Sequence, residues 1–140
     1  YEIRLSLVGS EMCIRDSWSV HPMEHELSAY YDITHGAGLA ILTPHWMRHV
    51  LNTRTVEKFR TYGVNVWDVP ADLPSMEAAE LAIKRTADYF KALGLPSRLS
   101  EVGIDEKYLE IMAEKSASRM KGTYVELTKD EILQIFKEAM

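Results

Sequence analysis

The sequence predicts an all-α domain of about six helices, on the strength of two observations. After residue 17, apolar residues recur at the three- and four-residue spacing of a helix, and no strand-like alternation of convincing length appears. Only residues 123–127 could form a short extended piece. The 140 residues, of which 46% are hydrophobic, suit one globular domain.

The first seventeen residues do not fit this pattern. They lack a sustained helical stripe and resemble the translation of a sequencing adapter, although Ile3, Leu5 and Leu7 could alternatively belong to a native strand. Artefactual segments of this kind are excluded from fold reasoning. We therefore predict that residues 1–17 are not native, and that residues 18–140 form a helical domain truncated at its upstream end.

The first two predicted helices flank a short break. Residues 21–31 contain no β-branched residue, and Pro22 is tolerated because it falls near the first turn. Residues 32–36 interrupt the helix with Asp, Thr and Gly, which favour turns. Residues 38–51 form the second helix, which Pro44 should bend because it removes one backbone hydrogen bond.

Glycines mark the ends of the next two predicted helices. The first is short, covers residues 56–62 and should stop at Gly63. After a loop over residues 65–73, a longer helix begins with Ser75 as its N-cap and ends at Gly94. The predicted buried stripe of this longer helix consists of Ala79, Ile83, Ala87, Phe90 and Leu93.

Polar residues mark the starts of the last two predicted helices. Asp105 opens a helix that includes Met120 and ends before Gly122. Thr128 and Glu131 have the spacing of a capping box, which predicts the start of the final helix. This helix should pack through Ile132, Ile135, Phe136 and Ala139.

Charge, cysteine content and hydropathy exclude several classes of protein. A net charge of −5 argues against a nucleic-acid partner, because neutralising phosphates requires clustered Lys and Arg. A single cysteine excludes an internal disulfide framework and suits a reducing compartment such as the cytoplasm, and this cysteine, Cys13, drops out if residues 1–17 are not native. No apolar run approaches the roughly 20 residues that span a bilayer, so we expect no membrane association.

Three histidines around the first break form the candidate chemical centre. His21 and His25 are four residues apart, so a helix presents both from one face, where they could bind one divalent metal. His35 is fourteen residues after His21, about 21 Å away along an unbroken helix. The two could share a metal only if the chain turns back at residues 32–36. Spacing leaves the pairs His21/His25 and His21/His35 equally open.

Simpler interpretations apply to other parts of this region. A cluster of histidines can be ordinary helix-face residues, and the first pair is not a zincin HExxH motif, because Glu24 and Glu26 lie outside the required positions. His45 and His49 are another pair four residues apart, which we expect to lie on a half-exposed helix face. Trp46 is expected in the core or in a pocket wall.

The stretch HPMEHELSAYYDITHGAGLA, residues 21–40, resembles the histidine signature of the iron-containing (group III) alcohol dehydrogenases. Its amino-acid sequence is similar to that of the butanol dehydrogenase branch. The resemblance extends from about residue 18 to the end of the chain and includes LTKDEI at residues 127–132. The resemblance implies the helical C-terminal metal-binding domain of the dehydroquinate synthase-like fold.

The resemblance also implies a role for each histidine. His21 and His35 would bind the divalent metal, most readily Fe²⁺ by family analogy, with Zn²⁺ as the alternative. His25 would face the substrate and the nicotinamide and take part in proton transfer. The Asp and His that complete the family's metal site, and its dinucleotide-binding domain, lie upstream of the signature and have no counterpart here. No cofactor-binding residue is therefore expected in this chain.

The implied activity is the interconversion of short-chain primary alcohols, such as butanol, and aldehydes with NADH or NADPH, by a homodimer of the intact enzyme. The fragment alone is expected to be inactive. Two alternatives stay open: a helical metal-binding or interaction module that functions alone, and a polyol (glycerol-type) dehydrogenase of the same superfamily.

Overall fold

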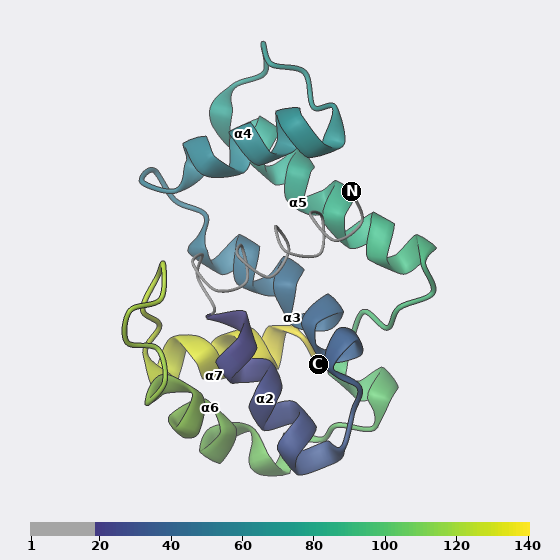
Figure 1. Cartoon of the computed structure of the whole chain (residues 1–140), viewed down its shortest axis with the longest axis vertical. Coiled ribbons are helices and arrows are strands. Elements are labelled where there is room, and N and C mark those ends of the chain that lie inside the picture. Colours follow the sequence, from purple (N-terminus) through teal and green to yellow (C-terminus); the bar gives the residue numbers. More distant parts are fainter. Residues whose placement is uncertain (1–18) are drawn as a thin grey trace, which may run out of the picture.

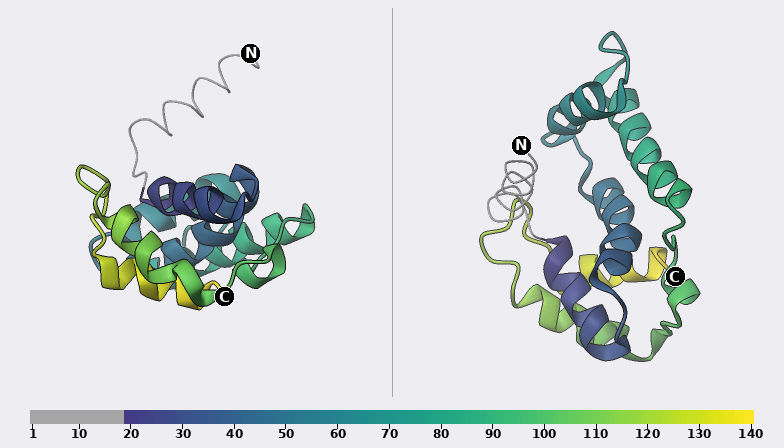
Figure 2. Two further views of the ribbon diagram at one scale, coloured as in Figure 1. Left: turned by 90° about the horizontal axis from the view of Figure 1, so that it is seen from below. Right: turned by 45° about the vertical axis from the view of Figure 1, so that its right-hand side comes forward.

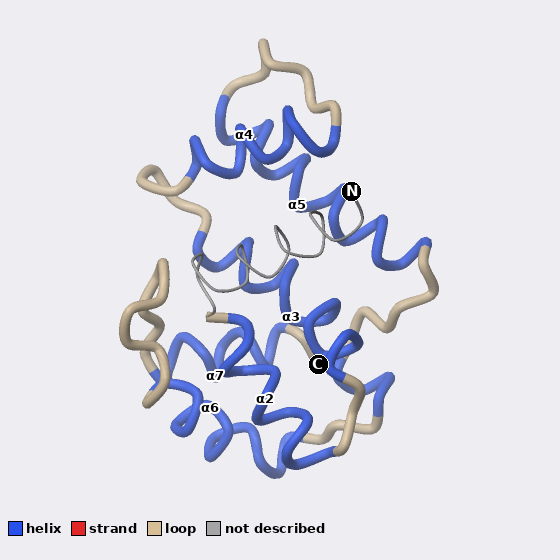
Figure 3. The backbone as a smooth tube through the Cα atoms, viewed as in Figure 1, coloured by secondary structure: helices blue, strands red, loops and turns tan. Residues whose placement is uncertain are grey.

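The computed structural model describes residues 19–140, which form helices joined by loops (Figures 1 and 3). Within these residues there is no strand, which confirms the all-α prediction. Residues 1–18, with the adapter-like stretch and Cys13, lie outside the described part. No helix in residues 19–140 is both long enough and apolar enough to cross a membrane. The helices are α2 (Val20–Tyr31), α3 (His35–Val50), α4 (Val56–Trp67), α5 (Ser75–Ala92), α6 (Leu109–Ala117) and α7 (Lys129–Glu138), with short 3₁₀ helices η1 (Leu99–Val102) and η2 (Glu106–Tyr108).

Helix α3 connects the two ends of the molecule. At one end α4 and α5 pack against each other, and at the other end α2, α6 and α7 gather, as two further views also show (Figures 1 and 2). α3 contacts α2, α5 and α7. The main core lies among these helices and includes the fully buried side chains of Met23, Leu27, Met112, Ile132 and Phe136.

The prediction that Gly63 stops the third helix is wrong. α4 continues to Trp67 and ends at Asp68, which adopts the left-handed conformation with φ 52°. Gly63 is buried where α4 meets α5, and a Cβ built on it would lie 2.8 Å from the Cβ of Ala82. The glycine is needed there for close helix packing, a requirement set by a residue nineteen positions away.

Two other predicted helix starts shift. α3 begins at His35, three residues before the predicted start, so the break shrinks to residues 32–34. Ser75 is the first residue of α5 and the cap position falls on Pro74, so the prediction of Ser75 as N-cap is wrong. The prediction that Gly94 follows the end of this helix is confirmed, because Gly94 has the positive φ of 77° typical of a helix C-terminus.

The buried face of α5 differs from the predicted stripe. Ala79 and Ile83 are buried as predicted, but Leu93 is 58% exposed. α5 packs against both α4 and α3, and Ala87 and Phe90 are half-buried where they line a small hollow against α3. The buried residues of the helix are Ala78, Ala79, Ala82, Ile83 and Thr86.

Both polar residues that were predicted to start helices, Asp105 and Thr128, are N-caps in the structure. The Asp105 carboxylate accepts a hydrogen bond from the Lys107 backbone N–H at 3.0 Å, but it caps η2, and α6 ends at Ala117, before Met120. The capping box of α7 is confirmed: the backbone N–H of Thr128 donates to Glu131 Oε2 at 2.8 Å, and Thr128 Oγ1 accepts from the Glu131 N–H. Residues 123–127 form no strand.

Candidate metal centre

A short reversal of the chain between α2 and α3 creates the site. Asp32 ends α2 in the left-handed conformation, φ 51°, and its N–H bonds the Ser28 carbonyl at 3.0 Å. After Ile33, the Thr34 carbonyl accepts from the N–H of Ala37 at 3.0 Å as α3 begins. This three-residue connection places α3 beside α2 (Figure 1).

The reversal brings all three predicted histidines together. The ring centroids of His21 and His35 are 5.3 Å apart, instead of the roughly 21 Å of an unbroken helix. The ring of His25 lies 6.0 Å from that of His21 and 5.7 Å from that of His35. The three imidazoles therefore form one cluster, with two contributed by α2 and one by the first residue of α3.

The donor atoms of this cluster are close enough for one cation. The ligand atoms of Glu24, His25 and His35 all lie within 4.8 Å of one another. Donors about 2.0–2.2 Å from a shared zinc-like cation are at most about 4.4 Å apart, so the observed spacing is only slightly wider than that around one cation. His21 is outside this set, although its ring lies nearest to that of His35. The roles of His21 and His35 as ligands and of His25 in catalysis stay predictions.

Sequence reasoning missed Glu24. Its side chain is fully buried, one oxygen lies in hydrogen-bonding contact with His35 Nδ1, and the other accepts from Ser28 Oγ. A local signal did exist: Glu24 follows Met23 and precedes Leu27 by three positions, which places it on the apolar face of α2. A buried carboxylate needs a partner, and here the partner is a candidate metal ligand.

Gly38 makes room for this carboxylate. A Cβ built at position 38 would lie 2.7 Å from Glu24 Cγ and 3.1 Å from Glu24 Oε1. By contrast, a Cβ built at Gly36 would meet nothing within 4 Å. Of the two glycines in the signature, Gly38 is therefore the one that the packing of the site requires.

Burial and charge keep one imidazole neutral. Burial lowers the pKa of His21, and repulsion from His35 and His25 lowers it further, while Glu24 partly offsets both effects. The neutral form of an imidazole is the one that can bind a metal. His21 therefore keeps its metal-binding form to a more acidic pH than a free histidine.

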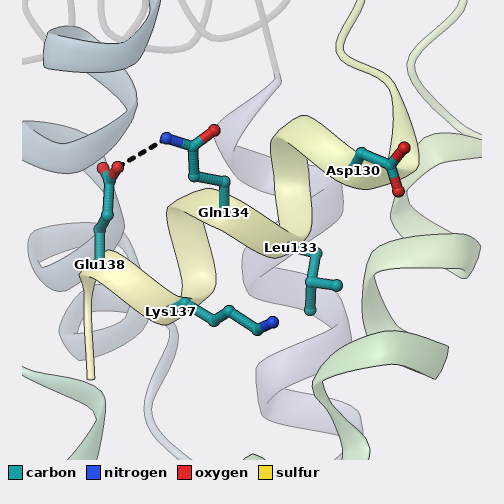
Figure 4. Close-up of a pocket in the computed structure, with 5 residues that line it drawn as sticks. All are labelled: Asp130, Leu133, Gln134, Lys137 and Glu138. Atoms are coloured by element: carbon teal, nitrogen blue, oxygen red, sulfur yellow. Dashed lines mark hydrogen bonds between the residues drawn. The ribbon is translucent and has the colours of Figure 1, made fainter.

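His45 and His49 are separate from this cluster. His45 lines a small hollow between α3 and α5 with Pro44 and Phe90, and His49 Nε2 lies 3.6 Å from Glu131 Oε1. Trp46 is buried in the core, as predicted. Another hollow lies along α7. Figure 4 shows that the residues lining it all belong to α7, and none of them is a histidine.

Fold and site together define a helical domain with a candidate metal centre. The family model described as "Fe-containing alcohol dehydrogenase family, C-terminal" matches residues 5–140, and the chain belongs to this family. The matched region begins inside the adapter-like stretch, whose origin stays a prediction. Membership of the family confirms the resemblance seen in residues 21–40.

Two curated relatives that share more than half of their aligned residues with this chain are butanol dehydrogenases. The chain is 56% identical to NADH-dependent butanol dehydrogenase B of Clostridium acetobutylicum over 128 residues, which cover 89% of this chain and 33% of the relative. It is 52% identical to NADH-dependent butanol dehydrogenase A of the same organism over 125 residues, covering 87% of this chain and 32% of the relative. The chain thus spans about a third of the length of the relatives it matches.

Solved structures agree with the fold. A crystal structure of 1,3-propanediol oxidoreductase matches with a TM-score of 0.79 and 30% identity, over 87% of this chain and 32% of that protein. NADH-dependent butanol dehydrogenase A from Thermotoga maritima matches with a TM-score of 0.76 and 28% identity, over 88% of this chain and 33% of that protein. The helical arrangement is therefore similar to that of about a third of each of these proteins.

Proposed function

We propose that this chain supplies the metal-binding part of an alcohol dehydrogenase that interconverts short-chain primary alcohols and aldehydes with a nicotinamide cofactor. One observation carries the proposal: the α2–α3 reversal gathers three imidazoles and a buried carboxylate at one place. Membership of the Fe-containing alcohol dehydrogenase family gives this cluster its chemical context.

His21 and His35 would hold the cation, and we propose Fe²⁺ as that cation. Imidazole nitrogens suit iron and zinc alike, and zinc has the greater raw affinity, so the choice of iron depends on the family. When bound, the cation supplies Lewis-acid polarisation of the alcohol or carbonyl oxygen. The half-buried His21 and the more exposed His35 approach this position from two different helices.

His25 would move the proton. Its side chain is exposed, and its ring centroid lies 6.0 Å from that of His21 and 5.7 Å from that of His35, so it can reach a substrate oxygen held beside them. Imidazole ionises near neutral pH and can both donate and accept a proton at a ring nitrogen. We assign it the transfer between the substrate oxygen and solvent.

For the substrate we propose butanol and butanal, and for the cofactor NADH in preference to NADPH. The support is the identity of 52–56% to relatives named NADH-dependent butanol dehydrogenases, against 33% to a 1,3-propanediol dehydrogenase. We further propose a homodimer in the cytoplasm. No described residue is assigned to the nicotinamide cofactor.

A hybrid enzyme tests this function directly. Residues 19–140 would replace the matching third of C. acetobutylicum butanol dehydrogenase B, which supplies the upstream two thirds. We expect the hybrid to retain about one divalent metal per chain and to reduce butanal with NADH. The 140-residue chain alone should bind metal weakly and reduce no butanal.

Three outcomes would contradict parts of the proposal. A folded hybrid without bound metal would remove the metal centre, and butanal reduction by the 140-residue chain alone would favour a module that functions without an upstream domain. A clear preference for 1,3-propanediol over butanol in the reverse reaction would move the substrate toward diols. Metal analysis and circular dichroism on the same samples separate loss of metal from loss of fold.

A further inference from the structure

We infer that Glu24 is a positioning residue of the metal centre, which fixes the tautomer and orientation of His35 so that its Nε2 faces the cation. This inference rests on the proposed function, because it assumes that His35 binds a metal. It goes beyond that function by assigning a role to a carboxylate that lies within the signature but is not one of its three histidines.

The contact between Glu24 and His35 determines which nitrogen is available. Glu24 Oε2 lies against His35 Nδ1, and a carboxylate is an acceptor, so Nδ1 carries the hydrogen and donates it. The lone pair then resides on Nε2, on the side of the ring away from Glu24. Metal-binding histidines commonly donate their other ring N–H to a carboxylate in this way, which fixes the ring and raises its basicity.

Burial makes Glu24 a rigid partner. Its side chain has no solvent-exposed surface, whereas the His35 side chain is 52% exposed and would otherwise rotate freely. Glu24 Oε1 also contacts Ser28 Oγ, whose single hydrogen can be donated either to Glu24 Oε1 or to the Ile33 carbonyl. Gly38, which has no side chain, lies against the Glu24 side chain as well. The carboxylate therefore stays in one orientation, and His35 follows it.

The same geometry argues against Glu24 as a direct ligand. Both carboxylate oxygens already have partners, and the group is covered by protein on all sides. To bind a cation, the carboxylate would have to give up the histidine contact and leave its buried position. The exposed side of the cluster, where the ring of His25 lies, is formed by the imidazoles.

The Glu24→Gln variant tests this role, with Glu26→Gln as its matched control. Glu26 is also on α2 and buried, 3% exposed, but its Oε1 lies 3.1 Å from Arg119 Nη1 and it is not part of the group of candidate ligands. In the hybrid enzyme, Glu24→Gln should weaken Co²⁺ binding about 10- to 100-fold, because that is the usual cost of losing such a partner. Glu26→Gln should leave Co²⁺ binding unchanged.

A second measurement needs no metal. In the ¹⁵N-labelled 140-residue chain, at a pH where imidazoles are neutral, nitrogen chemical shifts should place the His35 hydrogen on Nδ1. Glu24→Gln should shift it toward Nε2, and Glu26→Gln should not. A purely structural role for Glu24 would change the melting temperature of the chain without moving this tautomer.

The outcomes separate the inference from the proposed function. If the unsubstituted hybrid binds no metal, the proposed function is wrong. The His35 tautomer measured in the 140-residue chain does not depend on that result. If the hybrid holds Co²⁺ and Glu24→Gln holds it equally well, or if His35 carries its hydrogen on Nε2 in the unsubstituted chain, the positioning role is wrong. A change of the Co²⁺ absorption spectrum to a different coordination number in Glu24→Gln would make Glu24 a ligand and also overturn the inference.

Discussion

Gly63 and Ala82 face each other across the α4–α5 interface with no room for another methyl group. A Cβ at position 63 would lie 2.8 Å from Ala82 Cβ, 3.2 Å from Val69 Cγ2 and 3.3 Å from the Ala78 carbonyl oxygen. None of these atoms is the far end of a flexible side chain. The glycine thus sets how closely the two helices approach.

We predict that Gly63→Ala lowers the free energy of unfolding by about 1–3 kcal/mol, as overpacking of a close interface usually does, despite a helix-propensity gain of about 1 kcal/mol. Urea denaturation measures the change. The double variant Gly63→Ala with Ala82→Gly removes the opposing methyl group and should recover part of the loss. An additive double variant would show that the two residues do not interact.

We predict that the three histidines separate into two functional classes. In the hybrid enzyme, His21→Ala and His35→Ala should each abolish metal retention through gel filtration. His25→Ala should retain the metal and lower kcat for butanal reduction about 10²- to 10⁴-fold, the usual contribution of a general acid or base. Equal metal loss from all three variants would mean that His25 is also a ligand.

We predict that Gly38→Ala damages the metal centre while Gly36→Ala does not. The new methyl group at position 38 would displace Glu24, whose Cγ lies 2.7 Å from the Cβ position. The Cβ position of residue 36 is open, so there Ala should be neutral or stabilising by up to about 1 kcal/mol. Metal content and thermal unfolding of both hybrids measure this; equal metal content would contradict it.

We predict that His45 makes the chain less stable as the pH falls. Burial, and then the charge of Arg48, lower the pKa of His45 from its ordinary value of 6.5, so the unfolded chain takes up this proton first. Stability is therefore full above the unfolded pKa and declines as the pH drops from 6.5 toward the folded pKa. His45→Gln should reduce the loss of unfolding free energy between about pH 7.5 and pH 5.5. If His45→Gln loses as much unfolding free energy over this pH range as the unsubstituted chain, His45 makes no such contribution. Part of the loss should persist in His45→Gln, because the pKa of His21 is also lowered.

We predict that Thr128→Ala costs about 1 kcal/mol of stability, because it removes the side-chain cap of α7. Thr128→Ser keeps the capping oxygen and serves as the control. Urea denaturation of both variants gives the difference. A Ser variant as unstable as the Ala variant would assign the loss to the missing methyl group instead of the cap.

Local signals predicted much of the fold. The Thr128–Glu131 capping box and the stop at Gly94 depend on residues within one helical turn, and both are confirmed. Gly63 looked like the same kind of signal as Gly94, but its neighbours are on α5, which spacing along α4 cannot reveal. The wrongly predicted end of α4 and the difference between the predicted and observed buried faces of α5 have one cause. In both, the packing partner is on another helix, which the local sequence does not reveal.

The site was predictable to a similar extent. Histidine spacing together with the break before α3 indicated that His21 and His35 could meet, and their rings lie 5.3 Å apart. The choice between His25 and His35 as the partner of His21 could not come from spacing, and the two rings also lie at similar distances from that of His21, 6.0 Å and 5.3 Å. Glu24 was missed because its importance depends on a contact that forms only after the chain has turned back.

The three-residue connection between α2 and α3 has a consequence for how the chain folds. Bringing His21 beside His35 closes a loop of only fourteen residues, and loops of about ten residues close in roughly 10–100 ns, with a small entropy loss. The contacts of α2 with α6 join segments much farther apart and carry a higher contact order. The α2–α3 pairing can therefore form early and bring the three imidazoles together before the remaining helices dock.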